Sequence, residues 1–520
     1  MNISFRKIAR LLLAGALFAH RLAPADALDQ TGVRLLRQQA TNVDGSGIRV
    51  AQPEAAAPTF EVRPTSLGQP ASLFSYFSAA GRADVYPNSV GVESGHANGV
   101  GNTFYGNPAG VATNVAHVDN YDADFFITNY VFNLAPAPAA AIVNESYTFG
   151  PQTIADQQAV DSAYDDYQDY FGTIFVSAAC NASISLVVCS PGTDYNCISV
   201  GAYYGGNYYN SIGPTIDNGR CKPDLTALST ATSFSTPQVS GAVAVLLQAA
   251  LRGDGGGDTN SAADVRTLKA ALLNGAVKPA GWTNSNASPL DARHGAGVLN
   301  LFNAYEQLIG GKQNFSVSSF SALGGAHPPV AVTNHLAVLS GWDFCTNSTS
   351  ATNDAVNHYF FNVANGSVTA TLVWNRQFSE TNINNLDLFL FNAANSNLVA
   401  CSTSRVDNVE HIFVPQLPAG RYDLQVLKNG GTNVVSDTER YALAWAFVSP
   451  TLRLAKSGMN LTLTWPVYPD GFTVEATTNL SSTNWDASGL AAASVTNSMN
   501  SLPLNATNAA QFFRLRPLDF

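Results

Sequence analysis

Short apolar runs alternate with longer amphipathic stretches between residues 44 and 310. The apolar runs predict buried strands at residues 47–51, 139–143, 173–179 and 198–203. The longer stretches predict helices at residues 157–170, 239–251 and 263–273. Strands that alternate with helices are typical of an α/β domain built on a parallel sheet.

The pattern changes after about residue 311. Residues 316–341 are rich in Ser, Gly, Pro and small side chains, which predicts a linker. From Tyr359 onward, short β-type runs follow one another between turn residues, which predicts an all-β sandwich, and a smaller set of such runs begins near Pro450. We therefore expect an α/β domain, a β-sandwich and a small β module at residues 28–312, 313–449 and 450–520. The β units should fold apart from the first domain.

The N-terminal residues 1–27 have the pattern of a secretory signal peptide. Basic residues precede a short apolar run at residues 11–19, and Ala25-Asp26-Ala27 fits the small-x-small cleavage pattern. We expect cleavage near Ala27 and a secreted or extracytoplasmic protein. The apolar run is too short to span a bilayer, and no later run is long enough for a stable membrane span.

Composition narrows the range of partners. The chain has 26 basic and 37 acidic residues and a formal net charge of −11. We expect no nucleic-acid partner, because phosphate binding needs clusters of Lys and Arg. The six cysteines lack metal-ligand spacing with His, which argues against a zinc site. Export would allow disulfides. Cys345 could pair with Cys401, and the connectivity of the others stays open: Cys180, Cys189, Cys197 and Cys221.

The segment ATSFSTPQVSG at residues 231–241 opens the most apolar of the predicted helices. Thr232 and Ser233 could cap this helix, because their side-chain oxygens can accept hydrogen bonds from free backbone N–H groups. A serine at a helix start also lies where N–H groups and the helix dipole stabilise a developing anion. Such a serine becomes a nucleophile only beside a base.

Six stretches of the first domain resemble motifs of the subtilisin-like serine proteases, or subtilases. The segment that holds Ser233 resembles the family's Gly-Thr-Ser-x-x-x-Pro-x-Val-x-Gly. GHANGVG at residues 95–101 resembles the family's His-Gly-Thr-x-Val-Ala-Gly, and this pattern flanks neither His117 nor His294. The others are GIRVAQPE at 47–54, IVNESY at 142–147, FVSAACN at 175–181 and KPDLTA at 222–227.

The resemblance implies a secreted serine endopeptidase that works through an acyl-enzyme. Ser233 would be the nucleophile, His96 the general base and Asn181 the oxyanion donor. Glu54 falls where the family has the Asp that orients the histidine, which would make a Glu-His-Ser triad; Asp84, shortly before the histidine motif, is its competitor. The substrate would pair with the backbone of residues in the family's Asn-x-Ser segment. These are Ser146, Tyr147 and Thr148.

Several departures from the family motifs keep other functions open. Cys180 and Ala231 stand where the family has Gly, and Ala97-Asn98 replaces Gly-Thr. The main alternative is therefore a degenerate subtilase that binds peptides without cutting them. A second alternative is an extracellular adhesin whose β units bind surface polysaccharide.

The region after the first domain resembles the β-sandwich that follows the catalytic domain in some secreted subtilases. The resemblance rests on NLDL at residues 385–388, DNVE at 407–410 and LPAGRY at 417–422, while the last unit resembles a fibronectin-type module loosely. Asp387 and Asp407 could contribute to a structural calcium site, because hard cations prefer oxygen ligands. The implied reaction requires no cofactor. The expected partner is a protein or peptide substrate, and the protein is expected to be a monomer.

Overall fold

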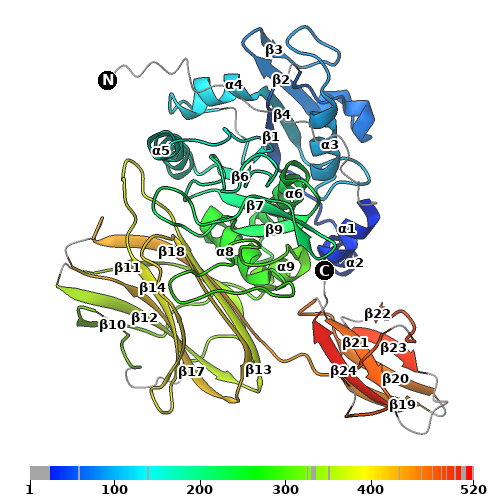
Figure 1. Ribbon diagram of the computed structural model, residues 1–520, viewed down its shortest axis with the longest axis vertical. Coiled ribbons are helices and arrows are strands. Elements are labelled where there is room, and N and C mark those ends of the chain that lie inside the picture. Colours follow the sequence, from blue (N-terminus) through cyan, green and yellow to red (C-terminus); the bar gives the residue numbers. More distant parts are fainter. Residues whose placement is uncertain are drawn as a thin grey trace.

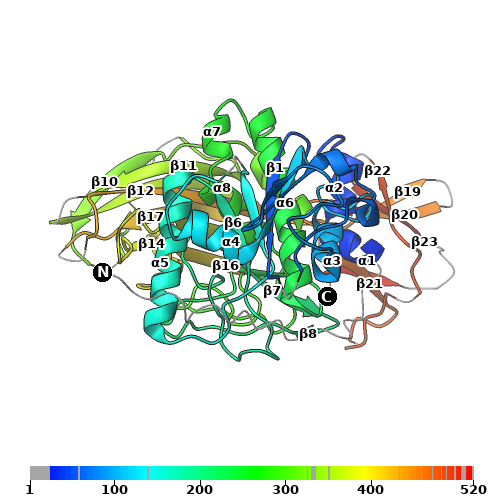
Figure 2. The same ribbon diagram turned by 90° about the horizontal axis from the view of Figure 1, so that it is seen from above.

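The computed structural model describes residues 24–517 apart from short gaps. The gaps are residues 57–58, 138–139, 325, 330–334, 350–351, 432–433, 458–459, 471, 482, 488, 497–498 and 505–510. Most of the predicted signal peptide, residues 1–23, therefore lies outside the described residues. Figures 1 and 2 show an α/β domain with a β-sandwich and a small β module on opposite sides of it.

A nine-stranded sheet, parallel except at its two ends, forms the centre of the α/β domain. The strand order is β3-β2-β4-β1-β5-β6-β7-β8, and β9 pairs with β7. Most residues of the inner strands are buried, as expected when helices cover both faces of a parallel sheet. The strands are β1 (Arg49–Glu54), β2 (Phe74–Ser78), β3 (Gly81–Ala83), β4 (His117–Asp122), β5 (Ile142–Glu145), β6 (Ile174–Ala178), β7 (Ile198–Tyr204), β8 (Asn207–Tyr208) and β9 (Leu225–Leu228).

Helix α6 is the central helix of the domain and packs against β5, β6, β7 and helix α3. Within the described part of the chain, it is the one helix that is long and apolar enough to cross a membrane, and 89% of its apolar stretch is buried inside the fold. The expectation that no later run is long enough for a membrane span is thus wrong in length, but the burial of α6 makes it a core helix. The helices are α1 (Pro24–Gln30), α2 (Val33–Gln39), α3 (Gly95–Phe104), α4 (Ala123–Phe126), α5 (Ile154–Phe171), α6 (Thr232–Arg252), α7 (Thr259–Ala262), α8 (Val265–Gly275) and α9 (Leu301–Ile309), with the 3₁₀ turns η2 (Pro64–Leu67) and η3 (Ala71–Leu73) and the π-helical turn η4 (Ile127–Val131).

The predicted α/β class is confirmed, and the predicted strands and helices match β1, β5, β6, β7, α5, α6 and α8. One boundary differs in a way that matters for the site. Strand β1 was expected to end at residue 51, but it runs on to Glu54, which stays paired in register with Asp122 of β4. Glu54 is thus held by the sheet.

The sandwich consists of two antiparallel sheets. The five-stranded sheet has the order β10-β12-β17-β14-β15, and the four-stranded sheet has the order β11-β18-β13-β16. Alternate side chains of both sheets meet in one apolar core, as in other β-sandwiches. The strands are β10 (Val317–Ala322), β11 (Ser340–Ser348), β12 (Asn353–Val363), β13 (Gly366–Trp374), β14 (Leu386–Asn392), β15 (Leu398–Ser402), β16 (Val409–Leu417), β17 (Gly420–Lys428) and β18 (Thr438–Val448).

The sandwich packs directly against the α/β domain, and the separate folding of the two units stays a prediction. Trp342, Val373 and Ala444 of the four-stranded sheet belong to the same buried apolar cluster as α6, α8 and α9. The indole N–H of Trp342 donates to the carbonyl oxygen of Leu308 at 2.9 Å. The linker expected at residues 316–341 is wrong in part, because β10 lies within these residues and pairs with β12. Apolar burial across the boundary joins the two units into one core.

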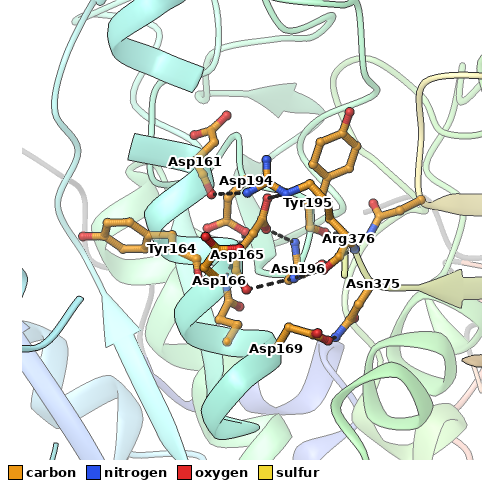
Figure 3. Close-up of polar contacts among 12 residues, drawn as sticks. Asp161, Tyr164, Asp165, Asp166, Asp169, Asp194, Tyr195, Asn196, Asn375 and Arg376 are labelled. Carbon is orange, nitrogen blue, oxygen red and sulfur yellow. Dashed lines mark hydrogen bonds and ion pairs between the residues drawn. The ribbon is translucent and has the colours of Figure 1, made fainter. Parts of the chain in front are cut away.

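Polar contacts reinforce this boundary on the side of α5, as Figure 3 shows. Arg376 Nε lies 3.2 Å from Asp165 Oδ2, and the backbone N–H of Arg376 donates to Asn196 Oδ1 at 2.8 Å. Asp169 accepts hydrogen bonds from the side-chain amide of Asn375 at 3.0 Å and from the N–H of Phe378 at 2.9 Å. These contacts set the orientation of the sandwich on α5.

The small module has its own apolar cluster, which includes Trp465 and Val474. It contacts the α/β domain through Asp470, whose backbone N–H donates to Asn303 Oδ1 at 2.8 Å and whose carboxylate accepts from Asn300 Nδ2 at 2.9 Å. Its strands are β19 (Arg453–Ser457), β20 (Asn460–Pro466), β21 (Phe472–Thr477), β22 (Ser494–Thr496), β23 (Met499–Leu504) and β24 (Phe512–Pro517).

Candidate active site

His96 is the second residue of α3, and Glu54 ends the neighbouring strand β1. The side chain of Ser94 accepts a hydrogen bond from the backbone N–H of Ala97, which caps the helix and fixes its first turn. His96 Nδ1 lies 2.7 Å from Glu54 Oε2. The Glu54 side chain is almost fully buried, whereas the His96 side chain is 22% exposed. One edge of the imidazole therefore faces a buried carboxylate, and the ring remains accessible.

Two residues that the sequence analysis missed position the Glu54 carboxylate. Gln52 Nε2 donates to Glu54 Oε1 at 2.8 Å and to the carbonyl oxygen of Ala97 at 3.0 Å. The hydroxyl of Tyr105 donates in turn to Gln52 Oε1 at 2.5 Å. Gln52 precedes Glu54 by two positions in β1, so both side chains lie on one face of the sheet. The alternation of side chains along a strand could have identified Gln52 from the sequence. Tyr105 has no such signal, because it follows the C-terminal end of α3 and is distant from β1 in the sequence.

Glu54 also sets the protonation of His96. Burial lowers the pKa of the imidazole, but the charge of Glu54 and its hydrogen bond act more strongly together and raise the pKa above the ordinary value of 6.5. A carboxylate in this place favours the imidazolium form. His96 is thus suited to accept a proton and hold it briefly.

Ser233 is the second residue of α6, close to the chain that follows β5. Its hydroxyl donates to the carbonyl oxygen of Ser146 at 3.4 Å, and the hydroxyl of Ser146 donates to the carbonyl oxygen of Ser233 at 3.0 Å. The helix-capping alternative does not hold, because Ala231 is the N-cap residue and makes no side-chain hydrogen bond. The Ser233 side chain is partly exposed. The ring of Phe234, the next residue, packs beside His96 with centroids 5.7 Å apart.

Asn181 lies at the end of the chain segment that leaves β6, next to the start of α6. Its side-chain Oδ1 accepts hydrogen bonds from the backbone N–H of Thr232 at 2.8 Å and from the hydroxyl of Thr232 at 3.0 Å. Because both contacts hold the oxygen end, the Nδ2 end is left to donate to a ligand. The structure therefore brings an amide donor to the residue preceding Ser233.

The predicted substrate segment runs unpaired from the end of β5. Asn144 Nδ2 donates to Ser146 Oγ at 3.0 Å, and this contact holds Ser146 beside Ser233. The Tyr147 side chain is buried and donates to Glu145 at 2.8 Å, so Tyr147 can offer only its backbone to a substrate. Thr148 is partly exposed and its hydroxyl donates to Cys180 Sγ at 3.7 Å.

Asp84, His117 and His294, the alternatives to Glu54 and His96, contact other groups. The Asp84 side chain is 59% exposed, pairs with Arg82 at 2.9 Å and accepts from Ser75 Oγ at 2.6 Å. His117 Nε2 lies 3.0 Å from Ser75 Oγ, and His294 Nδ1 lies 3.0 Å from Asp291. None of these distances involves His96.

The two aspartates considered for calcium lie in separate surroundings. Asp407 accepts hydrogen bonds from the N–H of Cys221 at 2.6 Å and from Ser404 Oγ at 2.7 Å, and Asp387 accepts from Asn429 Nδ2 at 2.8 Å. In the described part of the chain, no three His, Cys, Asp or Glu side chains are placed to hold a metal ion. Calcium binding stays a prediction, and the described residues do not identify a set of ligands for the ion.

Glu145, at the end of β5, is a fully buried carboxyl group beneath the substrate segment. Burial raises its pKa to about 8, although Ser177 Oγ and Tyr147 donate to it at 2.6 and 2.8 Å. The folded protein therefore binds a proton between pH 4.5 and about 8 that the unfolded chain releases. Within that window, the free energy of unfolding should fall as pH rises.

We expect Glu145→Gln to remove this pH dependence. The variant should gain stability over the parent protein as pH rises through the window, by on the order of a few kcal/mol at pH 8. Urea unfolding at pH 5, 6.5 and 8 measures the difference, with the exposed Glu380→Gln as the control. If the free energies of unfolding of the parent protein and Glu145→Gln differed by the same amount at all three pH values, the expectation would be contradicted.

Glu54 and His96 form one contact pair, while Ser233 contacts Ser146 and Asn181 contacts Thr232 at the start of α6. A carboxylate, a histidine, a serine and an amide donor are the groups that a serine-hydrolase site requires. Residues 75–299 match the model of the subtilase family. This part of the chain is therefore a subtilase-family domain, a serine-type peptidase. The matched residues include His96, Asn181 and Ser233, and Glu54 precedes them.

Several solved structures are similar to this chain at low identity. The prenylagaramide maturation protease PagA is 20% identical over 54% of this chain and 99% of that chain, with a TM-score of 0.36. Fervidolysin from Fervidobacterium pennivorans, a keratinolytic enzyme related to subtilisin, is 14% identical over 85% of this chain and 73% of that chain, with a TM-score of 0.39. Tripeptidyl peptidase 2 is 13% identical over 74% of this chain and 43% of that chain, with a TM-score of 0.34. No curated protein matches the chain.

Proposed function

We propose that this protein is a secreted serine endopeptidase with a Glu54-His96-Ser233 triad. The observation that carries the proposal is the 2.7 Å contact between the buried Glu54 carboxylate and His96, in a subtilase-family domain whose Ser233 lies in the first turn of α6. A carboxylate that holds Nδ1–H of the imidazole leaves Nε2 as the base.

The proposed reaction begins with a peptide strand lying along Ser146, Tyr147 and Thr148. Main-chain hydrogen bonds to such an unpaired segment would give affinity that is independent of most side chains. The hydroxyl of Ser233 then turns from the carbonyl oxygen of Ser146 toward His96 Nε2 and attacks the scissile carbonyl carbon. Catalytic hydrogen bonds often tighten in this way only when substrate is bound.

Charge then develops on the substrate carbonyl oxygen and on His96. The Nδ2 group of Asn181 and the backbone N–H of Ser233 stabilise the oxyanion, since the first N–H groups of a helix have no helical partner. Glu54 stabilises the imidazolium, which next donates its proton to the leaving amine. Water repeats the sequence on the acyl-enzyme and frees Ser233.

The proposal of secretion rests on the N-terminal pattern. The expected cleavage site lies in α1, and the side chain of Leu28 is buried in the main core. Cleavage after Ala27 would leave Leu28 as the new N-terminus, anchored by that burial.

The proposed activity is tested by incubating the full chain with a chemically unfolded protein and identifying new amino termini by mass spectrometry. An endopeptidase should generate termini at internal peptide bonds. The pH dependence of kcat/KM should show activity lost as pH falls through the raised pKa of His96, with the midpoint above 6.5. Binding of the unfolded protein without new termini would instead support the degenerate, peptide-binding alternative.

Asn181→Ala should lower kcat by about 10²–10³-fold with a smaller change in KM, because the amide would act on the transition state. Asn181→Asp is the matched variant: it retains the acceptor for Thr232 and has no N–H group to donate. Steady-state kinetics on one peptide should show comparable losses in both variants. Full activity in Asn181→Asp would exclude the oxyanion role.

A further inference from the structure

A cavity of about 420 Å³ lies where the α/β domain, the sandwich and the small module meet. Its walls come from α8, the loop after it and α9, from the outer face of the four-stranded sheet, and from the turn between β20 and β21. Cavities that bind small molecules enclose about 300–1,000 Å³. The residues of the proposed triad, Glu54, His96 and Ser233, line no part of it. The cavity is therefore a second candidate site, apart from the proposed active site.

Lys278, in the loop after α8, places its amino group at the wall of this cavity. Its Nζ donates to the carbonyl oxygen of Ala296 at 2.5 Å and to that of Ala276 at 3.4 Å. The same atom lies 4.9 Å from the centre of the Trp282 ring and 5.6 Å from the centre of the Phe413 ring, and both rings line the cavity. An ammonium group has three N–H donors. The two carbonyl oxygens therefore leave one N–H for a ligand that lies against these rings.

The aromatic walls of the cavity are held in place by other parts of the fold. The indole N–H of Trp282 donates to the carbonyl oxygen of Gly295 at 2.8 Å, and Trp282 packs edge-to-face on Phe413 with ring centres 5.8 Å apart. On the side of the small module, the hydroxyl of Tyr468 is hydrogen-bonded to the hydroxyl of Ser340 at 3.0 Å. Aromatic rings prefer offset-stacked or edge-to-face neighbours. A flat aromatic ligand can thus pack against walls that already exist.

Among the described residues, no carboxylate compensates the charge of Lys278. Burial lowers the pKa of its amino group to about 7, and no neighbouring acid in that part of the chain raises it. Asp470, the acid in the cavity wall, accepts from Asn300 Nδ2 at 2.9 Å. Burial raises the pKa of Tyr468, also in the wall, to about 12. Burial, and then the nearby charge of Lys278, lower the pKa of His411 well below 6.5. Lys278 is therefore the group at the cavity whose charge changes near neutral pH.

The amide side chains of the wall are used within the fold. Asn274 Nδ2 donates to Gln307 Oε1 at 2.9 Å. Asn303 Oδ1 accepts from the backbone N–H of Asp470 at 2.8 Å. These contacts fix the wall, and they leave Lys278 as the charged donor that faces the cavity.

We propose that this cavity binds a small arylalkyl carboxylate, with the carboxylate on Lys278 and the aromatic ring against Trp282 and Phe413. The remaining N–H of the ammonium group would donate to the carboxylate in a charge-assisted hydrogen bond. An opposite charge at this place favours the charged form of the amine, which burial disfavours. Burial of the ring would supply the apolar part of the affinity. The inference is independent of the proposed peptidase activity.

The cavity is shared by all three units, so a bound ligand should also stabilise their junction. The units meet without a covalent link, because all six cysteines are free thiols in this structure, Cys345 and Cys401 included. A ligand that binds only the folded chain stabilises it by mass action. The midpoint of thermal unfolding should therefore rise with the concentration of the ligand, and an unchanged midpoint would contradict the proposed binding.

The test is a calorimetric titration of the full chain with 3-phenylpropionate and with 3-phenylpropanol, which has the same ring and length but no charge. At pH 6 we expect the acid to bind at one site with an affinity at least about tenfold higher than that of the alcohol, because hydrogen bonds to charged groups are the stronger ones. Since Lys278 loses its proton above a pKa of about 7, the affinity for the acid should fall by about tenfold or more between pH 6 and 8.5, with uptake of a proton on binding at the higher pH. The affinity for the alcohol should stay constant. Equal affinities for the acid and the alcohol, or no binding of the acid, would overturn the proposal.

Lys278→Met keeps an unbranched apolar side chain and removes the charge, so it should bind the acid and the alcohol with similar affinity. Lys456→Met, at an exposed lysine of β19, is the control and should bind as the parent protein does. If Lys278→Met folds poorly, the parent protein is acetylated with N-hydroxysuccinimidyl acetate and the modified lysines are mapped by mass spectrometry. At ten times its Kd, 3-phenylpropionate should slow the acetylation of Lys278 by about tenfold and leave that of Lys456 unchanged. Binding that still favours the acid in Lys278→Met, or equal acetylation of Lys278 with and without the acid, would overturn the proposal.

Ser233→Ala separates this inference from the proposed function. Because Ser233 lies outside the cavity wall, this variant should bind 3-phenylpropionate as tightly as the parent protein does. Binding that favours the acid, in a chain that hydrolyses no peptide, would support the cavity site and reject the endopeptidase. Hydrolysis by a chain that binds no 3-phenylpropionate would do the reverse.

Discussion

Ser233→Ala should lower turnover by about 10⁶-fold, which is the size of the loss when the nucleophile of a related serine protease is removed. The acyl-enzyme requires a covalent bond to Ser233 Oγ, and no other hydroxyl in the first turn of α6 can replace it. Ser235 Oγ donates within the helix to the carbonyl oxygen of Thr232 at 3.1 Å, and Thr236 Oγ1 does so at 2.8 Å. The folded structure should survive, because Ser233 is only partly buried.

Ser235→Ala is the matched control for this variant. It removes a hydroxyl from the same helical turn and should retain activity within about tenfold, because its hydrogen bond is local. Peptide hydrolysis and thermal unfolding are measured for both variants. Residual turnover in Ser233→Ala close to that of Ser235→Ala would show that Ser233 is not the nucleophile.

Glu54→Gln should lower kcat by at least about 10²-fold and by up to about 10⁴-fold, the loss caused by the comparable change in a Ser-His-Asp enzyme. Gln retains the size of Glu but lacks its charge and can favour the wrong imidazole tautomer. The pKa of His96 should also fall, because Glu54 is the group that raises it. The acid limb of the kcat/KM profile should thus shift to lower pH while the plateau falls.

Asp84→Asn is the control that decides which carboxylate acts. Asp84 is exposed and contacts Arg82 and Ser75, so this variant should have near-normal turnover on the same peptide. Loss of turnover in Asp84→Asn with retention in Glu54→Gln would transfer the role to Asp84. Normal turnover in both would mean that His96 works without a carboxylate partner.

Much of the α/β domain could be predicted because its inner strands are continuously apolar. Strands β5, β6 and β7 are buried on both faces, and a run such as residues 173–179 shows this directly in sequence. The residues near the reacting groups could also be named, since Ser233 and His96 lie in ordered motifs. The contact of Glu54 with His96 was expected from the resemblance to the subtilase motif, in which the acid follows a strand, whereas here the strand itself includes Glu54.

Contacts between distant segments could not be predicted in this way. Tyr105, the C-cap residue of α3, reaches Gln52 only in the assembled fold, and neither residue carries a motif. The linker expected at residues 316–341 was wrong in part for a similar reason. A segment rich in Ser, Gly and Pro indicates a linker, whereas the pairing of β10 with β12 and the burial of Trp342 against α9 depend on the assembled fold.

Covalent labelling tests the central claim, that His96 activates Ser233, most directly. The full chain is treated with a serine-directed phosphonate, and the modified peptide is identified by mass spectrometry. We predict one adduct, on Ser233, that is absent from Ser233→Ala and forms more slowly in Glu54→Gln. An unlabelled Ser233 in a folded protein, or an adduct that forms equally fast without Glu54, would contradict the proposed triad.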